Sequence, residues 1–271
     1  MRRAPLALAR SLMLLLSATS LVALWACGGK PKDEHAKDAH GADQGKGDHG
    51  KGGHWTYSGD AGPEHWGGTC NTGQRQSPID LKGQARSMKT EVVLDYQSST
   101  ARIANKGHTI QIDLTKGGDL VLAGERYTLQ QFHFHTPSEH ALEGRRPAME
   151  AHFVHKNAKG DLAVVGVMLE IGAADPMLAP IWTNLPPQPG APTAIQGVLI
   201  NARDLMPATE EFFVYSGSLT TPPCSEGVTW LVFNSPMSIS PEQASAFERI
   251  VGPSARPLQP AKDRTLLKVS N

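Results

Sequence analysis

The chain has 271 residues, 39% of them hydrophobic, so it is long enough to bury a sizeable core. Its 26 basic and 26 acidic residues balance, which argues against a protein that binds nucleic acid by neutralising phosphates. The 27 glycines and 20 prolines are too few for a collagenous or disordered chain, but they indicate many turns and few long helices. Three cysteines are too few for a disulfide-stapled scaffold.

Residues 1–26 have the layout of a secretory signal, with arginines, no acidic residue and then an apolar run. The run is too short and poorly flanked for a membrane span. It ends in a sequence that resembles a bacterial lipobox, Leu24-Trp25-Ala26-Cys27-Gly28. The sequence therefore predicts an extracytoplasmic protein, periplasmic or on the cell surface, anchored to the membrane as a lipoprotein through Cys27. Plain secretion after cleavage nearby and an uncleaved anchor are the alternatives.

Residues 28–54 are rich in Lys, Asp, His and Gly and contain almost no apolar side chains. Such a segment cannot bury enough surface to offset its ordering entropy, so we expect a disordered tether. With Cys27 it forms a linker, 27–54, between the signal and one domain, 55–271. We interpret its histidines as solvated linker residues, with weak metal capture as the alternative: His35, His40, His49 and His54.

From residue 55 onwards, short apolar runs alternate with turn residues, which is typical of a mainly β protein. Residues 109–114 alternate as a half-buried strand does. Residues 162–169 read LAVVGVML, a continuous apolar run that predicts a strand covered on both faces. Residues 227–233 form a similar run and predict a further strand.

One helix is well marked near the C-terminus. Ser240 is a good N-cap, Pro241 follows it, and Gln243 completes a capping box. Gly252 stands just past the end of an apolar stripe formed by Ala244, Phe247, Ile250 and Val251. Residues 173–193 hold many prolines and have room for at most one short helix.

The segment 130–135 alternates strictly between polar and aromatic residues. In a strand, Gln131, His133 and His135 share one face, while Phe132 and Phe134 share the other. The phenylalanines would belong to the core. The two imidazoles would lie about 6.5–7 Å apart along the strand, which suits chelation of one metal ion.

The segment 150–155 alternates in the same way and places Glu150, His152 and Val154 on one face. Two adjacent strands whose histidines face the same way supply three nitrogens and leave a fourth position open. This arrangement indicates a catalytic zinc site, because structural zinc sites are usually closed by four protein ligands. The chain contains no His-Glu-x-x-His motif, so a helix-borne metalloprotease site has no support.

These motifs resemble those of the α-class carbonic anhydrases, and they run in that family's order across residues 55–265. The matching segments are Gly62-Pro63-Glu64-His65-Trp66, Gln76-Ser77-Pro78-Ile79, Gln131-Phe132-His133-Phe134-His135, Ser138-Glu139-His140, Glu150-Ala151-His152-Phe153-Val154-His155 and Ser218-Leu219-Thr220-Thr221-Pro222-Pro223. The resemblance implies a mainly β fold with a large central twisted, mostly antiparallel sheet and a few short surface helices.

The resemblance also implies a zinc enzyme that hydrates carbon dioxide reversibly to bicarbonate and a proton. His133, His135 and His152 match the zinc ligands, and Gln131 and Glu150 match the groups that accept imidazole N–H bonds and fix the ring tautomers. In this family zinc lowers the pKa of its water ligand to about 7, so a zinc-bound hydroxide is available at neutral pH to attack carbon dioxide.

Other matches give roles to residues that do not bind the metal. Thr220 matches a hydroxyl that accepts from the hydroxide and donates to Glu139, whose anion can only accept. His108 matches the proton shuttle, which an imidazole pKa near 6.5 suits, and Tyr57 matches a tyrosine that orders cavity water. The substrate contacts and the apolar wall for carbon dioxide correspond to Val154, Val164, Leu219, Thr220, Thr221, Val228 and Trp230.

Several residues of the matched segments are interpreted as structural. His65, His140 and His155 are not expected to bind metal, since strand alternation points His155 away from the other imidazoles. Trp55, Trp66 and Trp182 are assigned to packing. Lys106 and Gln111 stand where the best-known family members often have asparagine, which leaves the rate of proton transfer open.

Cys70 and Cys224 fall where many bacterial and secreted family members have a disulfide, and an exported compartment permits one. Two buried thiols are the alternative. For function, a relative that binds zinc without catalysis and a periplasmic zinc buffer built on the tether remain alternatives to the enzyme. Catalytically inactive relatives usually lack a zinc ligand, whereas all three histidines are present here. The expected partners are carbon dioxide, bicarbonate and a membrane, with no nucleic acid, and the chain is expected to be a monomer or homodimer.

Overall fold

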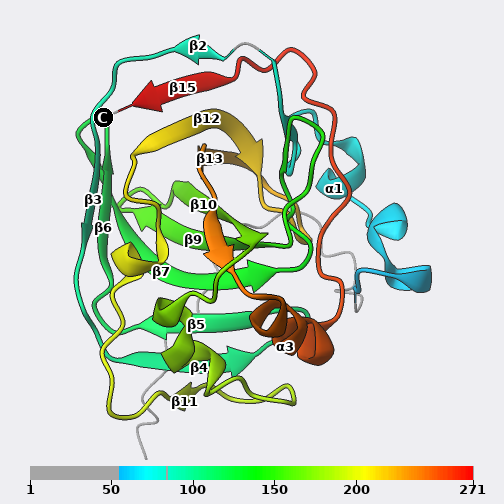
Figure 1. Cartoon of the computed structure of the whole chain (residues 1–271). Helices are drawn as coiled ribbons and strands as arrows, with labels where there is room; N and C mark the ends of the chain where they lie inside the picture. Colours follow the sequence, from blue (N-terminus) through cyan, green and yellow to red (C-terminus); the bar gives the residue numbers. More distant parts are fainter. Residues whose placement is uncertain (1–54, 84, 271) are drawn as a thin grey trace, which may run out of the picture. The chain divides into compact units, whose positions relative to one another are not determined.

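A large twisted β-sheet forms the centre of the molecule (Figure 1). The computed structural model describes residues 55–83 and 85–270, which belong to the unit Gly52–Asn271. The predictions for the signal, Cys27 and the tether lie outside these residues. No helix within the described ranges is long and apolar enough to cross a membrane.

Thirteen of the strands in the described residues form this sheet, in the order β11-β4-β5-β7-β9-β10-β13-β12-β15-β2, with β14 paired to β10, and β6 to β3 and β7. The strands are β2 (Arg86–Ser87), β3 (Val92–Tyr96), β4 (Ala101–Asn105), β5 (Ile110–Leu114), β6 (Gly118–Leu122), β7 (Glu125–His135), β9 (Met149–Asn157), β10 (Leu162–Ile171), β11 (Thr193–Ala194), β12 (Glu211–Ser218), β13 (Glu226–Phe233), β14 (Met237–Ile239) and β15 (Leu267–Ser270). A separate pair consists of β1 (Asp80–Leu81) and β8 (Ala141–Leu142).

The helices of the described chain are short: α1 (Thr69–Thr72), α2 (Ala179–Trp182), α3 (Pro241–Val251) and the 3-10 turns η1 (Gly59–Ala61), η2 (Pro63–His65), η3 (Pro176–Leu178) and η4 (Ala202–Leu205). Most strand pairs are antiparallel, but β10 runs parallel to β13 and β14, and β15 runs parallel to β2. The expectation of a mainly β fold with a large twisted sheet and few helices is confirmed, and the sheet is mixed.

The apolar run predicted to be covered on both faces is β10, which is buried along nearly its whole length. Its alternate residues enter two different cores. Val165 and Val167 belong to the larger core, while Val164 and Met168 belong to a smaller one with Trp230. A central strand with both faces buried has no polar side to present, which explains the absence of alternation in its sequence.

The predicted helix is α3, whose boundaries follow from its caps. The Ser240 side chain accepts from the Gln243 N–H, and the Gln243 side chain accepts from the Ser240 N–H, so the capping box is formed. Gly252 ends the helix with a φ of 73°, a conformation that favours glycine. Phe247 is buried, and its ring lies 6.1 Å from that of Phe134 on β7.

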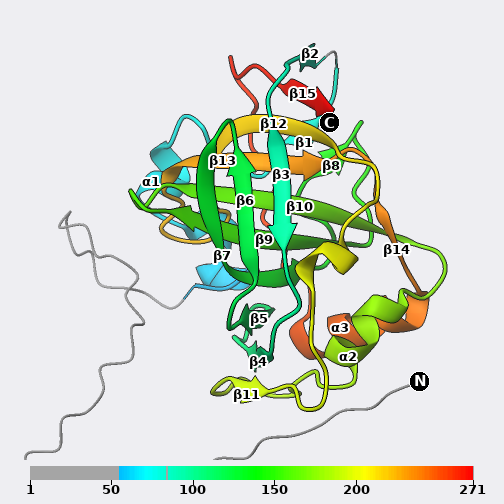
Figure 2. The same ribbon diagram turned by 90° about the vertical axis from the view of Figure 1, so that its left-hand side faces the viewer.

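Two views place α2 and α3 together at the β4–β5 end of the sheet, away from β2 and β15 (Figures 1 and 2). Trp182 of α2 packs on Phe134, with ring centroids 5.1 Å apart, and donates from its indole nitrogen to Gln243 O. The helices therefore cover the aromatic face of β7, and the histidine face of that strand remains for the site.

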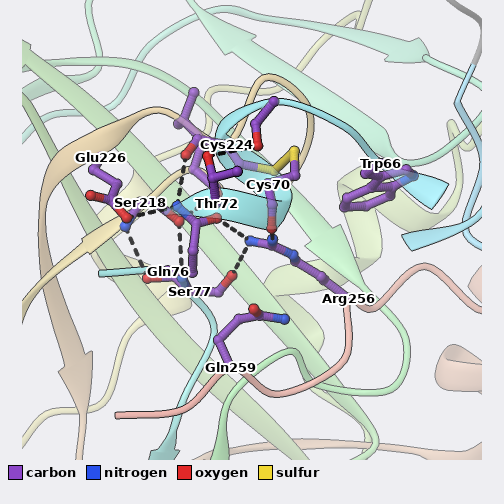
Figure 3. Close-up of a disulfide and its surroundings, with 12 residues drawn as sticks. Trp66, Cys70, Thr72, Gln76, Ser77, Ser218, Cys224, Glu226, Arg256 and Gln259 are labelled. Atoms are coloured by element: carbon purple, nitrogen blue, oxygen red, sulfur yellow. Dashed lines mark hydrogen bonds between the residues drawn. A yellow bond between two sulfur atoms is a disulfide. The ribbon is translucent and has the colours of Figure 1, made fainter. Parts of the chain in front are cut away.

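A disulfide joins Cys70 in α1 to Cys224, which follows the Thr-Thr-Pro-Pro segment, as the family resemblance implies (Figure 3). The bond closes a sequence separation of 154 residues. Gln76 Nε2 donates to Cys224 O at 3.1 Å. The backbone N–H of Ser77 donates to Ser218 Oγ at 2.9 Å, and that of Ser218 donates back to Ser77 Oγ at 3.1 Å. Hydrogen bonds therefore fasten the same two segments that the disulfide connects.

Arg256 is buried in this region, and its guanidinium binds several of the neighbouring segments (Figure 3). It donates to Gln76 Oε1 at 2.9 Å, to Ser77 O at 2.7 Å and to Cys70 O at 2.8 Å. The guanidinium carbon also lies 5.7 Å from the ring centroid of Trp66. A buried cation is tolerated here because oxygen acceptors replace its water.

Replacing both Cys70 and Cys224 by serine is expected to lower the free energy of unfolding by about 2–5 kcal/mol, because the unfolded chain is no longer cross-linked. The hydrogen bonds described above should keep the variant folded. Urea denaturation in oxidising buffer measures the difference, with wild type under strong reductant as a second way of opening the bond. Equal unfolding midpoints for all three samples would contradict the prediction.

Candidate metal centre

Three imidazoles meet where β7 and β9 pair. The antiparallel register sets His133 directly opposite His152, and His135 follows two residues along β7 on the same face. One nitrogen from each ring lies within 4.8 Å of the other two. The ring centroids are 5.0 Å apart for His133–His135, 5.4 Å for His133–His152 and 4.6 Å for His135–His152. The structure thus brings together the three histidines that the sequence singled out.

The β7 imidazoles each have one nitrogen occupied by an acceptor. His133 Nδ1 lies 2.8 Å from Gln131 Oε1, and His135 Nδ1 lies 2.6 Å from the carbonyl oxygen of Ser254. A carbonyl oxygen accepts only, so the proton is on Nδ1 in both rings. Each ring is therefore held in the tautomer that leaves the lone pair of Nε2 free for a metal.

The third ring, that of His152, is oriented by a buried carboxylate. This contact is made by Nε2, whereas His133 and His135 contact their acceptors through Nδ1. His152 Nε2 lies 3.0 Å from Glu150 Oε1, although the ring direction falls short of hydrogen-bond alignment. Glu150 is itself fixed: Oε2 accepts from the N–H groups of Glu139 at 2.9 Å and His140 at 2.8 Å, and Oε1 lies 2.7 Å from His140 Nδ1. His152 Nδ1 is thereby left clear of Glu150, and it lies 3.8 Å from Glu139 Oε2, the oxygen that is 3.6 Å from His135 Nε2.

The residues fit a zinc ion. His135 is almost fully buried, and its Nε2 has no hydrogen-bond partner among the described residues, which is costly for a polar atom unless it binds a ligand. Three neutral imidazole nitrogens with an open fourth position are a donor set that zinc prefers at catalytic sites. We therefore treat His133, His135 and His152 as able to hold zinc.

Burial favours neutral His133 and His135 rings, whereas at His152 burial is outweighed by the charge and hydrogen bond of Glu150, which raise the pKa of that ring above 6.5. Burial first, and then the neighbouring imidazoles, lower the pKa of His133 well below 6.5, so its lone pair is available at neutral pH. Burial alone would raise the pKa of Glu150, but the charges of His140 and His152 and their hydrogen bonds outweigh it and hold that pKa well below 4.5. A buried anion next to the histidines complements a cation bound to them.

His140, Glu150 and His152 also offer atoms within 4.8 Å of one another. These groups already bond among themselves, and His140 Nε2 lies 2.6 Å from the Tyr215 hydroxyl. They support the first cluster and do not form a second metal site. His140 is structural, as expected, and so is His155, which faces away and lies 2.8 Å from the Tyr96 hydroxyl.

A cavity of about 240 Å³ opens over the three histidines. Its lining includes polar side chains besides the three histidines: His108, Thr109, Gln111 and Gln131. It also includes most of the predicted apolar wall and the two threonines: Val154, Val164, Leu219, Thr220, Thr221 and Trp230. Val228 does not line the cavity. It is buried behind the wall with Val164 and Trp230.

Thr220 lines this cavity and Glu139 lies buried below it. Glu139 Oε1 accepts from the N–H of Arg256 at 2.8 Å. Its Oε2 has no hydrogen-bond partner within the described residues, so the bond expected from Thr220 is not formed in this arrangement. That oxygen instead faces the imidazoles, 3.6 Å from His135 Nε2 and 3.8 Å from His152 Nδ1.

His108 lies at the cavity edge, where its ring packs on Trp55 with centroids 4.6 Å apart. Burial lowers its pKa below 6.5. Tyr57 is close to Trp55, and burial together with the charge of Glu139 raises the pKa of the Tyr57 hydroxyl above its usual range. Lys106 lines an adjoining hollow with His108 and Tyr57, whereas Gln111 lines the cavity itself and donates to Asp113.

Two supports of the site were missed by sequence reasoning. The Ser254 carbonyl orients His135, and the Arg256 N–H holds Glu139. Both are backbone groups of a loop more than a hundred residues away in the chain, and a backbone group carries no signal in the sequence. The His140–Glu150 bond had a signal, since both residues lie in the matched motifs.

The family comparisons agree with this geometry. A profile described as "Eukaryotic-type carbonic anhydrase" matches residues 61–270. A carbonic anhydrase of Pectobacterium carotovorum is 41% identical over 226 residues, which cover 79% of this chain and 90% of that protein. A carbonic anhydrase of Nostoc sp. is 41% identical over 225 residues, covering 79% and 85%.

The fold is also similar to that of a solved structure. The α-carbonic anhydrase from Thermovibrio ammonificans, in complex with the inhibitor sulfanilamide, aligns with a TM-score of 0.77 at 40% identity. The alignment covers 80% of this chain and all of that one. From the histidine cluster, the cavity above it and these matches, we conclude that the chain belongs to the eukaryotic-type, or α-class, carbonic anhydrase family.

Proposed function

We propose that His133 and His135 bind zinc through Nε2 and that His152 binds it through Nδ1. The observation that carries this assignment is the state of the other ring nitrogens, which face Gln131, the Ser254 carbonyl and Glu150. As a carbonic anhydrase, the protein is a zinc enzyme that interconverts carbon dioxide with bicarbonate and a proton.

Zinc, when bound, acidifies a water ligand to a pKa of about 7 and so supplies the nucleophile at neutral pH. The apolar wall then gives carbon dioxide, which has no net dipole, a place from which ordered water is excluded. Val154, Val164, Leu219 and Trp230 present that surface directly beside the imidazoles. Gln111 and Thr109, which line the same cavity, offer polar groups to cavity water.

Thr220 and Glu139 are proposed to orient the nucleophile. An ionised carboxylate can only accept, so a Thr220 hydroxyl bonded to Glu139 must donate to it and accept on its other side. The support for this pair is that Glu139 Oε1 is anchored by the Arg256 N–H while Oε2 lacks a partner.

His108 is proposed to carry the proton away. It lines the same cavity as the three ligands and also the adjoining hollow, so its ring is accessible from both. Its pKa, lowered mainly by burial, makes it a weaker base than an exposed imidazole and so favours release of a proton that it has taken up. Tyr57, whose hydroxyl stays protonated, is proposed to order the intervening water.

The chain outside the domain is proposed to deliver the enzyme to a membrane. The Cys70–Cys224 disulfide is typical of proteins exported to an oxidising compartment. With 1–26 as a signal, Cys27 as the lipidated residue and 28–54 as the tether, the domain 55–271 would work outside the cytoplasm. A flexible tether of 27 residues spans about 5–6 Å times √27, roughly 30 Å, which keeps the cavity clear of the lipid.

The His152→Ala variant is expected to lose zinc, because two remaining imidazoles hold the ion too weakly. Elemental analysis after dialysis against a chelator should find about one zinc per wild-type chain and almost none in the variant, with hydration activity lost in parallel. The control is His155→Gln on the same strand but the opposite face, which should retain zinc. Full zinc and activity in His152→Ala would contradict the ligand assignment.

The Thr220→Ala variant should keep its zinc but lose hydration rate. The loss of one oriented hydrogen bond in such a site typically costs about a hundredfold to a thousandfold in kcat. Stopped-flow hydration assays measure this change, and Thr229→Ala, a surface substitution on β13 away from the cavity, is the matched control. A loss smaller than about threefold would show that the Thr220–Glu139 assignment is wrong.

The Cys27→Ser variant is expected to be soluble and fully active, whereas the wild type should pellet with membranes. A single acyl chain binds only marginally, so the multiple acylation of a bacterial lipoprotein is implied. Fractionation of cells followed by hydration assays on both fractions tests this difference. A wild-type protein that is already soluble, with a mature N-terminus beyond Cys27, would establish plain secretion instead.

A further inference from the structure

Gly166 lies in the middle of β10, within the buried part of that strand. Its neighbours two positions away on the same face of β10, Val164 and Met168, both carry buried side chains. A glycine inside a strand weakens it, because it adds conformational entropy to the unfolded chain and contributes no side-chain packing. Gly166 is also absent from the residues with positive φ, so its backbone conformation does not require glycine.

The strand register places Gly166 beside the proposed metal ligand. It lies opposite His152 on β9 and opposite Val232 on β13. A Cβ atom at this position would lie 2.9 Å from Glu150 Oε1 and 3.3 and 3.4 Å from the two Val232 methyl carbons. The space where a side chain would be is therefore occupied by the Glu150 carboxylate.

The Glu150 carboxylate is held in place through both of its oxygens. Its Oε2 accepts two backbone N–H bonds, from Glu139 and His140, and its Oε1 lies against His140 Nδ1 and His152 Nε2. The carboxylate has no solvent exposure, so leaving these partners would leave a buried charge without compensation. A methyl group at 166 would have to displace this network or the strands themselves.

We propose that Gly166 is a positioning residue of the zinc centre: its missing side chain is the space that lets the Glu150 carboxylate reach His152. The inference rests on the proposed ligation by His152, since it acts by fixing the orientation and basicity of that ring. Residues that orient metal-binding histidines typically contribute about 10- to 100-fold to metal affinity.

The test is the zinc affinity of Gly166→Ala, measured on metal-stripped protein by competition with a chromogenic chelator. We expect affinity to fall by about tenfold or more and zinc release to accelerate. Gly172→Ala, just beyond the end of β10, is the matched control, since its Cβ would crowd Ser238 Oγ at 2.6 Å, far along the strand from His152. This control should bind zinc like the wild type.

Two double variants distinguish displacement of the Glu150 carboxylate from a general effect of crowding at position 166. In Gly166→Ala/Val232→Ala the new methyl has room on the β13 side, so folding is protected while the zinc defect should persist. In a Glu150→Ala background, adding Gly166→Ala should change zinc affinity by less than about twofold, because the group it displaces is gone.

Wild-type affinity in Gly166→Ala would overturn the inference, as would restoration by Val232→Ala or an equal loss in the Glu150→Ala background. These failures are distinct from failure of the proposed function. If His152→Ala retains zinc, the ligand assignment itself is wrong. If His152→Ala loses zinc and Gly166→Ala does not, only the role of Gly166 is wrong.

Discussion

The buried carboxylate of Glu150 is the interaction on which the metal centre depends. An anion without solvent exposure is tolerated only when every lone pair is used, and here His140 and the Glu139 N–H satisfy it while His152 lies against it. The Glu150 carboxylate therefore fixes the His152 ring and the backbone at residues 139–140. Through that backbone it also positions Glu139, the second buried carboxylate of the site. The surrounding sheet leaves room for the carboxylate and excludes water from it. Hydrogen bonds are stronger in such an environment of low dielectric constant.

The two faces of β7 and β9 show how the fold positions the chemistry. Phe132 and Phe153 stack in the larger core at 5.1 Å, and the alternation of the strand then turns His133 and His152 to the opposite face. A slip of one residue in this pairing would bury the imidazoles among the phenylalanines. Packing of the aromatic face is thus what holds the metal face in register.

Local patterns in the sequence were sufficient to predict several strands and the longest of the described helices. Strand alternation identified the shared face of His133 and His135, and the Ser240–Gln243 capping box located α3, because both signals lie within a few residues. Long-range features were not predictable from the residues alone. The register between β7 and β9 and the Ser254 carbonyl at His135 depend on segments that meet only in the fold. The Cys70–Cys224 pairing came from the family resemblance, and Val228 was placed in the cavity wall although it packs behind it.

The position of zinc tests the account most directly. Anomalous diffraction at the zinc edge, from crystals of the zinc-loaded protein, locates the ion relative to the ring nitrogens. We predict one peak bound by His133 Nε2, His135 Nε2 and His152 Nδ1 at about 2.0–2.1 Å, with no fourth protein ligand. A peak at His140 and Glu150, a fourth side chain on the metal, or binding of His152 through Nε2 would contradict the account.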